Sequence, residues 1–414
     1  MTGMKDRRHF LFLNIGHFLD HLFTLIFATV VALVLAREWG MEYARLIPYA
    51  TPGLIAFGVF SLPAGWLADR WSREGMMAIF FIGIGLASVL TSAAQTPVQM
   101  ALGLFVVGMF AAIYHPVGLA MIARGGDSMG MDIAVNGVWG NMGVGCAALL
   151  TGVLIDVAGW RAAFWVPGGF SVLVGVAYLF TFGDRIRMKN AASASLAPTV
   201  AGSAGSLSSA ERHAMLIRVS AIIFFTTAVS SIIFQGTTFS LPKVFEERLQ
   251  GIAGSATLVG WMAFMVFAVA SMAQIVVGRQ LDRHGPRSVF AVVATIQLVF
   301  FSLMPGLTDW AAVFVALAFM LGAFGQIPIN DYMIGRMAKS ELRAMIYGTR
   351  YIISFGVWAT VVPLIAWVHH NWGFDVLFYI LAWSAAAILL AVFLLPKRLP
   401  DTSAAPVYQG RVSF

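Results

Sequence analysis

Two short stretches of this sequence read Gly65-Trp-Leu-Ala-Asp69-Arg70-Trp-Ser-Arg73 and Gly278-Arg-Gln-Leu-Asp282-Arg283-His-Gly-Pro-Arg287. The glycine and the aspartate of the first stretch recur 213 positions later in the second. Four further pairs recur in the same order at offsets of 211 or 212: Pro116 and Pro328, Arg124 and Arg336, Gly145 and Gly356, Trp160 and Trp372. A series of landmarks at nearly one offset predicts that the second half of the chain duplicates the first.

The composition is that of a membrane protein. Of the 414 residues, 59% are hydrophobic and 11% are charged, and the mean hydropathy is +0.84. A soluble domain carries roughly 25% charged residues. The 41 glycines suit membrane helices whose backbones approach closely. A single cysteine, Cys146, excludes an intrachain disulfide.

Twelve apolar runs are long enough to cross a bilayer, which takes about 20 residues per helix. They are 10–36, 45–68, 76–94, 98–123, 132–155, 161–182, 219–241, 253–277, 288–307, 311–335, 345–368 and 374–395. The long polar gap between spans 6 and 7 contains a segment rich in Ala, Ser and Gly, which is typical of a flexible linker. We therefore predict an all-α membrane protein of twelve transmembrane helices in two six-helix bundles, 1–183 and 219–414, joined by a linker at 184–218.

The basic residues predict the orientation. With the N-terminus inside, 20 of the 26 Lys and Arg residues fall in cytoplasmic segments, five fall outside, and Arg350 lies within span 11. This asymmetry is the positive-inside rule, so both termini are expected in the cytoplasm of a bacterium, with the protein in its inner membrane. Residues 1–9 form a short basic leader rather than a cleavable signal peptide. The net charge of +7 is then a topology signal, and no nucleic-acid partner is expected.

The doubled loop motif, together with Gly159-Trp160-Arg161-Ala-Ala-Phe164 before span 6, resembles the major facilitator superfamily. Ser72 departs from this resemblance because glycine is usual there, and Glu74 replaces a common basic residue. His17-Phe-Leu-Asp20-His21 and His115-Pro116 are similar to the fosmidomycin-resistance-type branch of exporters. The resemblance implies a carrier with a solute site between its halves. The glycines of span 5, at 137, 140, 143 and 145, partly resemble the antiporter motif of drug exporters, although close helix packing explains them as well.

The two repeated loops are candidate cytoplasmic gates. The residues involved are Asp69, Arg70, Arg73, Asp282, Arg283 and Arg287. A carboxylate at a helix end can pair with guanidinium groups and with a neighbouring helix N-terminus. Such a cluster can latch one conformation and release in another; alternatively, the charges only fix topology and tighten a turn.

Span 1 carries polar residues on one helical face, namely Asn14, His17, Asp20, His21 and Thr24. Ionisable groups inside a span usually mark a pathway, and a carboxylate beside imidazoles can exchange protons near neutral pH. We predict Asp20 as the proton-coupling group, helped by His17 or His21, with His115 of span 4 as a further candidate. The alternatives are a structural cluster that holds the spans together, or ligands for a divalent metal.

The candidate solute contacts come from both halves. They are Asn14, Thr24, Tyr114, Asn141, Gln235, Thr238, Gln326, Asn330, Tyr347 and Arg350. Pro116 is expected to kink span 4 and so help line a cavity. Arg350 lies within span 11 and needs an anion, supplied either by Asp331 or by the solute.

The predicted function is a proton-coupled secondary transporter of a small amphipathic or anionic organic solute, working by alternating access as an exporter. The alternatives are an uptake symporter for a small organic anion, a divalent-metal exporter, and a receptor or scaffold. No catalytic constellation appears, so we expect no enzyme, no cofactor and, for the leading function, no metal. The expected partners are a small-molecule substrate, protons and the lipid bilayer, and the protein is expected to act as a monomer.

Overall fold

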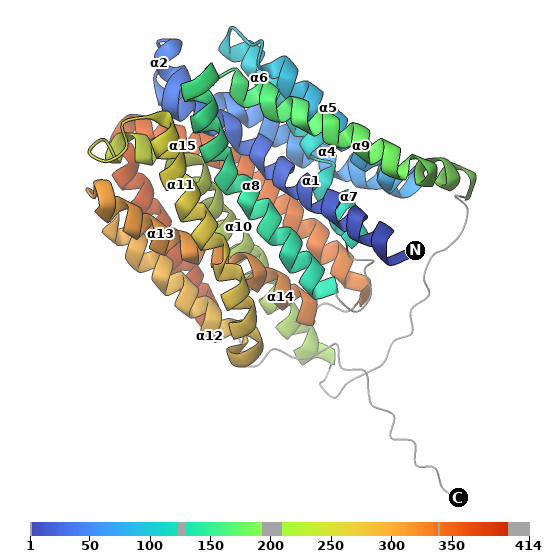
Figure 1. The fold of residues 1–414 in the computed structure, drawn as a ribbon. Coiled ribbons are helices and arrows are strands. Elements are labelled where there is room, and N and C mark those ends of the chain that lie inside the picture. Colours follow the sequence, from blue (N-terminus) through green and yellow to red (C-terminus); the bar gives the residue numbers. More distant parts are fainter. Residues whose placement is uncertain (1, 123–128, 193–208, 338–339, 396–414) are drawn as a thin grey trace, which may run out of the picture.

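The computed structural model describes residues 2–122, 129–192, 209–337 and 340–395, and its regular elements in these ranges are all helices (Figure 1). The helices of the first part are α1 (Thr2–Val30), α2 (Ala36–Glu38), α3 (Tyr43–Leu46), α4 (Thr51–Arg70), α5 (Arg73–Thr91), α6 (Pro97–Ala111), α7 (Tyr114–Ile122), α8 (Met129–Ala158) and α9 (Ala162–Ala192). A π-helical turn, Val31–Leu35, and a 3₁₀ turn, Ile47–Ala50, flank α2 and α3. The second part contains α10 (Ser209–Arg248), α11 (Ala256–Ser271), α12 (Ala273–Leu303), α13 (Asp309–Gly325), α14 (Ile327–Met337) and α15 (Ser340–Phe393). The all-α membrane prediction is confirmed.

Ten helical stretches of the described chain are long and apolar enough to cross a membrane, against the twelve expected. Two of the ten are unusually long, Ala256–Leu303 with 48 residues and Gly356–Phe393 with 38. Each contains a glycine with positive φ, Gly285 at 73° and Gly373 at 74°, where the backbone leaves the helical conformation. The expected boundaries between spans 8 and 9 and between spans 11 and 12 fall at these two glycines.

Helix breaks precede the repeated prolines in both parts of the chain. The break between α6 and α7 lies just before Pro116, and the break between α13 and α14 lies just before Pro328. Proline removes a backbone donor and crowds the carbonyl four residues earlier, so the helix cannot run straight through it. The kink expected in span 4 is therefore present, and its counterpart 212 residues later supports the internal repeat.

Close backbone approaches explain the glycines of α8. A Cβ added at Gly143 would lie 2.2 Å from the carbonyl oxygen of Phe18 on α1. A Cβ at Gly152 would lie 2.3 Å from the oxygen of Ala256 on α11. Real Cβ atoms do not come so near, so only glycine permits this packing. Close packing therefore explains Gly143 and Gly152, whereas a Cβ added at Gly137 would have its nearest atom at 3.6 Å, an ordinary contact.

The first and second parts of the chain meet along α8 and α11. In Figure 1 the blue-to-green helices lie mostly on one side of the molecule and the yellow-to-red helices mostly on the other, with α8 and α11 in contact between them. We call the end of the bundle that carries α2 the α2 end. There, Asp156 accepts hydrogen bonds from Thr257 N at 2.8 Å and from its hydroxyl at 2.6 Å, and His370 lies 3.2 Å from Glu42.

Candidate functional site

A buried carboxylate and an imidazole from different helices form the centre of the candidate site. Asp20 of α1 is 1% exposed, and its Oδ2 lies 3.3 Å from Nε2 of His115 on α7. Its other oxygen, Oδ1, has no hydrogen-bond partner among the described residues. The sequence predicted His17 or His21 as the helper of Asp20, whereas the structure places His115, the further candidate, at the Asp20 carboxylate. Because of the kink at Pro116, α7 starts next to α1, and this places the His115 ring beside Asp20.

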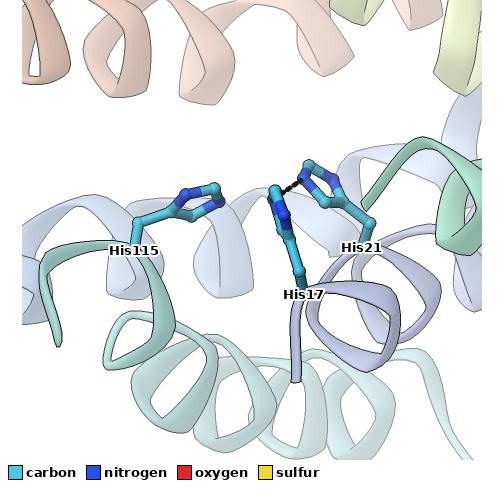
Figure 2. Close-up of side chains that lie close together, drawn as sticks. All are labelled: His17, His21 and His115. Carbon is cyan, nitrogen blue, oxygen red and sulfur yellow. Dashed lines mark hydrogen bonds between the residues drawn. The ribbon is translucent and has the colours of Figure 1, made fainter. Parts of the chain in front are cut away.

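The other two histidines stand one helical turn apart on α1. His17 Nε2 and His21 Nε2 are 3.2 Å apart, and the His115 ring lies edge-on to both (Figure 2). His17 Nδ1 donates to the carbonyl oxygen of Asn136 on α8 at 2.8 Å. A Cβ added at Gly140 would lie 2.6 Å from His17 Nε2, so this glycine leaves room for the ring.

An amide–phenol network fixes α1 against α7 and α8. Asn136 Nδ2 donates to Asn14 Oδ1 at 3.0 Å and to the Tyr114 hydroxyl at 2.9 Å. The Tyr114 hydroxyl lies 2.8 Å from the Leu13 carbonyl oxygen, to which it can donate. Asn14 and Tyr114 are buried and bonded to protein groups in this conformation, so here they position the histidine-bearing face of α1. Thr24 bonds back to the His21 carbonyl at 2.9 Å.

Buried amides and hydroxyls also meet in the second part of the chain. Gln326 accepts from Gln297 Nε2 of α12 at 3.0 Å and donates to the Ser230 carbonyl of α10 at 3.2 Å. Asn330 accepts from the Thr226 hydroxyl at 3.1 Å. Through the predicted amides Gln326 and Asn330, these contacts join α10 and α12 to the break between α13 and α14 and to α14 itself.

No described side-chain hydrogen bond links the remaining predicted solute contacts to another helix. Thr238 bonds back to the Phe234 carbonyl at 2.8 Å, and Gln235 is partly buried. Asn141 is 5% exposed, and its Nδ2 has no hydrogen-bond partner within the described ranges. Tyr347 and Arg350 belong to α15, but their side chains lie outside the described residues, so both the Arg350–Asp331 pair and a solute role for Arg350 stay predictions.

Aromatic rings connect the histidines to the second part of the chain. The Phe57 ring of α4 lies 5.9 Å from His115 and 5.0 Å from Trp358 of α15, measured between ring centroids. Trp358 in turn contacts Phe239 of α10 at 6.4 Å. The Asp20–His115 pair is thus one ring away from helices of the other part.

The two repeated loops differ in their local structure. Arg73 pairs with Asp69 at 2.6 Å, and Arg70 stacks over Trp66 at 4.5 Å. Ser72, which replaces the usual glycine, has an extended backbone with φ of −164° and accepts from Gly75 N at 3.0 Å, so it caps α5. Its counterpart Gly285 has φ of 73°, a conformation that favours glycine.

The second loop shows no comparable ion pair within the described part of the chain. Asp282 and Arg283 are exposed, Arg287 is partly buried, and no described group forms a salt bridge with them. The latching role of both loops remains a prediction.

Three polar residues that hold the site were not predicted from the sequence. Asn136 and Gln297 are buried without exposure, and Thr226 bonds Asn330. Gln297 is the single amide of the apolar run 288–307, whereas the predicted site residues were chosen from stripes of several polar groups. A lone amide in a membrane helix still needs a buried hydrogen-bond partner, so its presence in an apolar run could have predicted such a contact.

Comparisons with known proteins agree with this architecture. The family model described as Major Facilitator Superfamily matches residues 13–253 and 223–411. The 4-hydroxybenzoate transporter PcaK of Pseudomonas aeruginosa is 25% identical over 305 residues, which cover 68% of each chain. The puromycin resistance protein pur8 of Streptomyces alboniger is 32% identical over 158 residues, 37% of this chain and 31% of that protein, so the match spans about a third of it.

A solved structure shows the same fold. The crystal structure of the nucleoside transporter NupG superposes with a TM-score of 0.69 at 15% identity, covering 94% of this chain and 99% of that one. The family match, the transporter relatives and the fold agree with one another and with the doubled loop motif. The chain belongs to the major facilitator superfamily and is a secondary transporter, not an enzyme.

Proposed function

We propose that the protein is a proton-coupled carrier that moves a small amphipathic or anionic organic solute by alternating access, and that it works as an exporter. The Asp20–His115 pair carries this proposal. A carboxylate that is 1% exposed within apolar helices is costly as an isolated anion. A proton that arrives and leaves with each cycle offsets that cost, and the imidazole 3.3 Å away can relay it.

The proposed architecture places the solute between two six-helix bundles of twelve spans in all, 1–183 and 219–414, joined by the linker 184–218. The helix breaks at Gly285 and Gly373 support twelve spans. Both termini would face the cytoplasm of a bacterium, with the protein as a monomer in the inner membrane. The contacts Asp156–Thr257 and Glu42–His370 then close the outer side, as expected for an inward-facing state.

The proposed solute contacts are the polar groups that face the junction of the two bundles. Asn141 and Thr227 each have a buried polar atom without a described hydrogen-bond partner, and a solute could satisfy it. Gln235, Thr238, Gln326, Asn330, Tyr347 and Arg350 complete the proposed set, with Asn14, Thr24 and Tyr114 supporting it from the first bundle. Asp69, Arg70, Arg73, Asp282, Arg283 and Arg287 are proposed to latch the cytoplasmic side.

The alternative is uptake of a small organic anion in symport with protons. The relative named as a 4-hydroxybenzoate transporter supports this alternative, because it matches 68% of the chain. The relative named as a puromycin resistance protein supports the export of an amphipathic compound, over 37% of the chain. These two names supply one probe for each direction.

Flux through purified protein in liposomes separates the two functions. We would measure radiolabelled 4-hydroxybenzoate and puromycin under pH gradients imposed in each direction. Export predicts puromycin movement against the direction of proton entry, and symport predicts 4-hydroxybenzoate movement along with it. Flux of both probes that ignores the gradient in either orientation would refute proton coupling.

A further inference from the structure

The ring nitrogens of the three histidines of the site lie close enough together to be ligands of one metal ion. His17 and His21 of α1 and His115 of α7 each present a ring nitrogen, and these atoms all lie within 4.8 Å of one another. Figure 2 shows the three rings turned toward a common centre. Within the described ranges, no other group of three or more such side chains comes this close.

The closest nitrogen pair already has the spacing of metal ligands. Zinc binds imidazole nitrogen at about 2.0–2.1 Å, so two ligands of a tetrahedral ion are about 3.3–3.4 Å apart. His17 Nε2 and His21 Nε2 are 3.2 Å apart. The third nitrogen would have to move inward by at most roughly 1.5 Å to meet this geometry, which a modest turn of the His115 side chain provides.

The surroundings prepare the rings for a metal. The Asn136 carbonyl can only accept, so the 2.8 Å contact requires the proton of His17 to be on Nδ1. The Nε2 lone pair of a neutral His17 then accepts from His21 Nε2 at 3.2 Å, and a metal ion would take the place of that shared proton. Metal-binding histidines characteristically donate their other ring N–H to a carbonyl or carboxylate in this way. Gly140 leaves the space that the ring occupies, and Asp20 Oδ2 lies 3.3 Å from His115 Nε2, where it offsets positive charge or joins the ligand set.

The donor set also selects the kind of ion. Imidazole suits zinc, nickel, cobalt and copper, whereas magnesium and calcium prefer sites built from oxygen. The His115 side chain is 17% exposed, so the cluster is not sealed inside packed helices.

We propose that His17, His21 and His115, with Asp20 beside them, bind a divalent transition-metal ion such as Zn²⁺. The inference does not rest on the proposed carrier function, because binding is measurable without transport.

Calorimetric titration of the full chain tests the site. The protein would be purified in detergent through a tag that contains no histidine, freed of metal with a chelator, and titrated with ZnCl₂ and with MgCl₂. We expect one equivalent of Zn²⁺ at micromolar affinity or tighter and no response to Mg²⁺. His21→Gln and His115→Gln should each weaken Zn²⁺ binding at least about tenfold. His370→Gln, which removes an exposed imidazole at the α2 end, should leave it unchanged.

A second measurement needs no variant, so it holds even where a substitution impairs folding. X-ray absorption of the zinc-loaded, unsubstituted protein counts imidazole ligands directly, and we expect three. Absence of Zn²⁺ binding at micromolar concentration, Zn²⁺ affinity of both triad variants equal to that of the parent protein, or a zinc environment with fewer than three imidazoles would overturn the proposal.

Discussion

The close backbone approach of α1 and α8 predicts opposite effects for the same substitution at two positions of α8. In Gly143→Ala the new methyl carbon would lie 2.2 Å from the Phe18 carbonyl oxygen. To avoid this clash, α1 and α8 would have to separate by roughly 1 Å. A gap of that size removes about a quarter to a half of the dispersion energy of each atom pair across the interface. Overpacking of this kind costs about 1–3 kcal/mol. In Gly137→Ala the nearest atom is Gln274 Oε1 at 3.6 Å, an ordinary contact.

Gly137→Ala should therefore be neutral or stabilising, by up to about 1 kcal/mol, because alanine is the better helix former. The assay is thermal unfolding of the detergent-solubilised protein, followed by tryptophan fluorescence. The account expects the midpoint of Gly143→Ala to fall below that of the parent protein and the midpoint of Gly137→Ala to equal or exceed it. Equal midpoints for both variants would refute the close approach of α1 and α8.

Two further predictions concern stability. Tyr114→Phe removes the hydroxyl that bridges the Leu13 carbonyl and Asn136, and should cost about 1–3 kcal/mol of unfolding free energy; an unchanged denaturation midpoint, with Tyr49→Phe as the control, would show that the bridge is not formed. Gly285→Ala forces a side chain into a backbone with φ of 73° and ψ of 163°, a region that glycine almost alone adopts, and should cost about 1–3 kcal/mol. Gly278→Ala, in a helical stretch with no atom within 4 Å of the added carbon, should cost nothing, and equal losses in both would contradict the special backbone of Gly285.

Much of the fold could be predicted from sequence because bilayer thickness fixes helix length and the duplication fixes order. The expected kink at Pro116 and the close packing of the α8 glycines follow from backbone chemistry that any sequence displays. The form of the breaks at Gly285 and Gly373 was harder to foresee, since each is a kink at a single residue with positive φ rather than a loop.

The site was less predictable because the partner of each polar group depends on how helices rotate against one another. The polar face of α1 follows from the sequence spacing of its polar residues. The pairing of Asp20 with His115, however, depends on where α7 lies after the kink at Pro116. Tyr114 and Asn14 are polar groups in membrane spans, and sequence alone does not tell a solute contact from a bond to a neighbouring helix. In the structure both residues bond to a neighbouring helix, because the side-chain amide of Asn136 donates hydrogen bonds to Asn14 and to Tyr114.

The most direct test of proton coupling is solute accumulation by Asp20→Asn in liposomes under an imposed pH gradient. The substitution keeps the shape of a side chain that is 1% exposed and removes its ability to exchange a proton. Asp184→Asn, at an exposed position of α9, is the matched control. We expect Asp20→Asn to lose gradient-driven accumulation, while Asp184→Asn accumulates solute like the parent protein. Accumulation by Asp20→Asn that matches the parent and still follows the gradient would contradict this expectation.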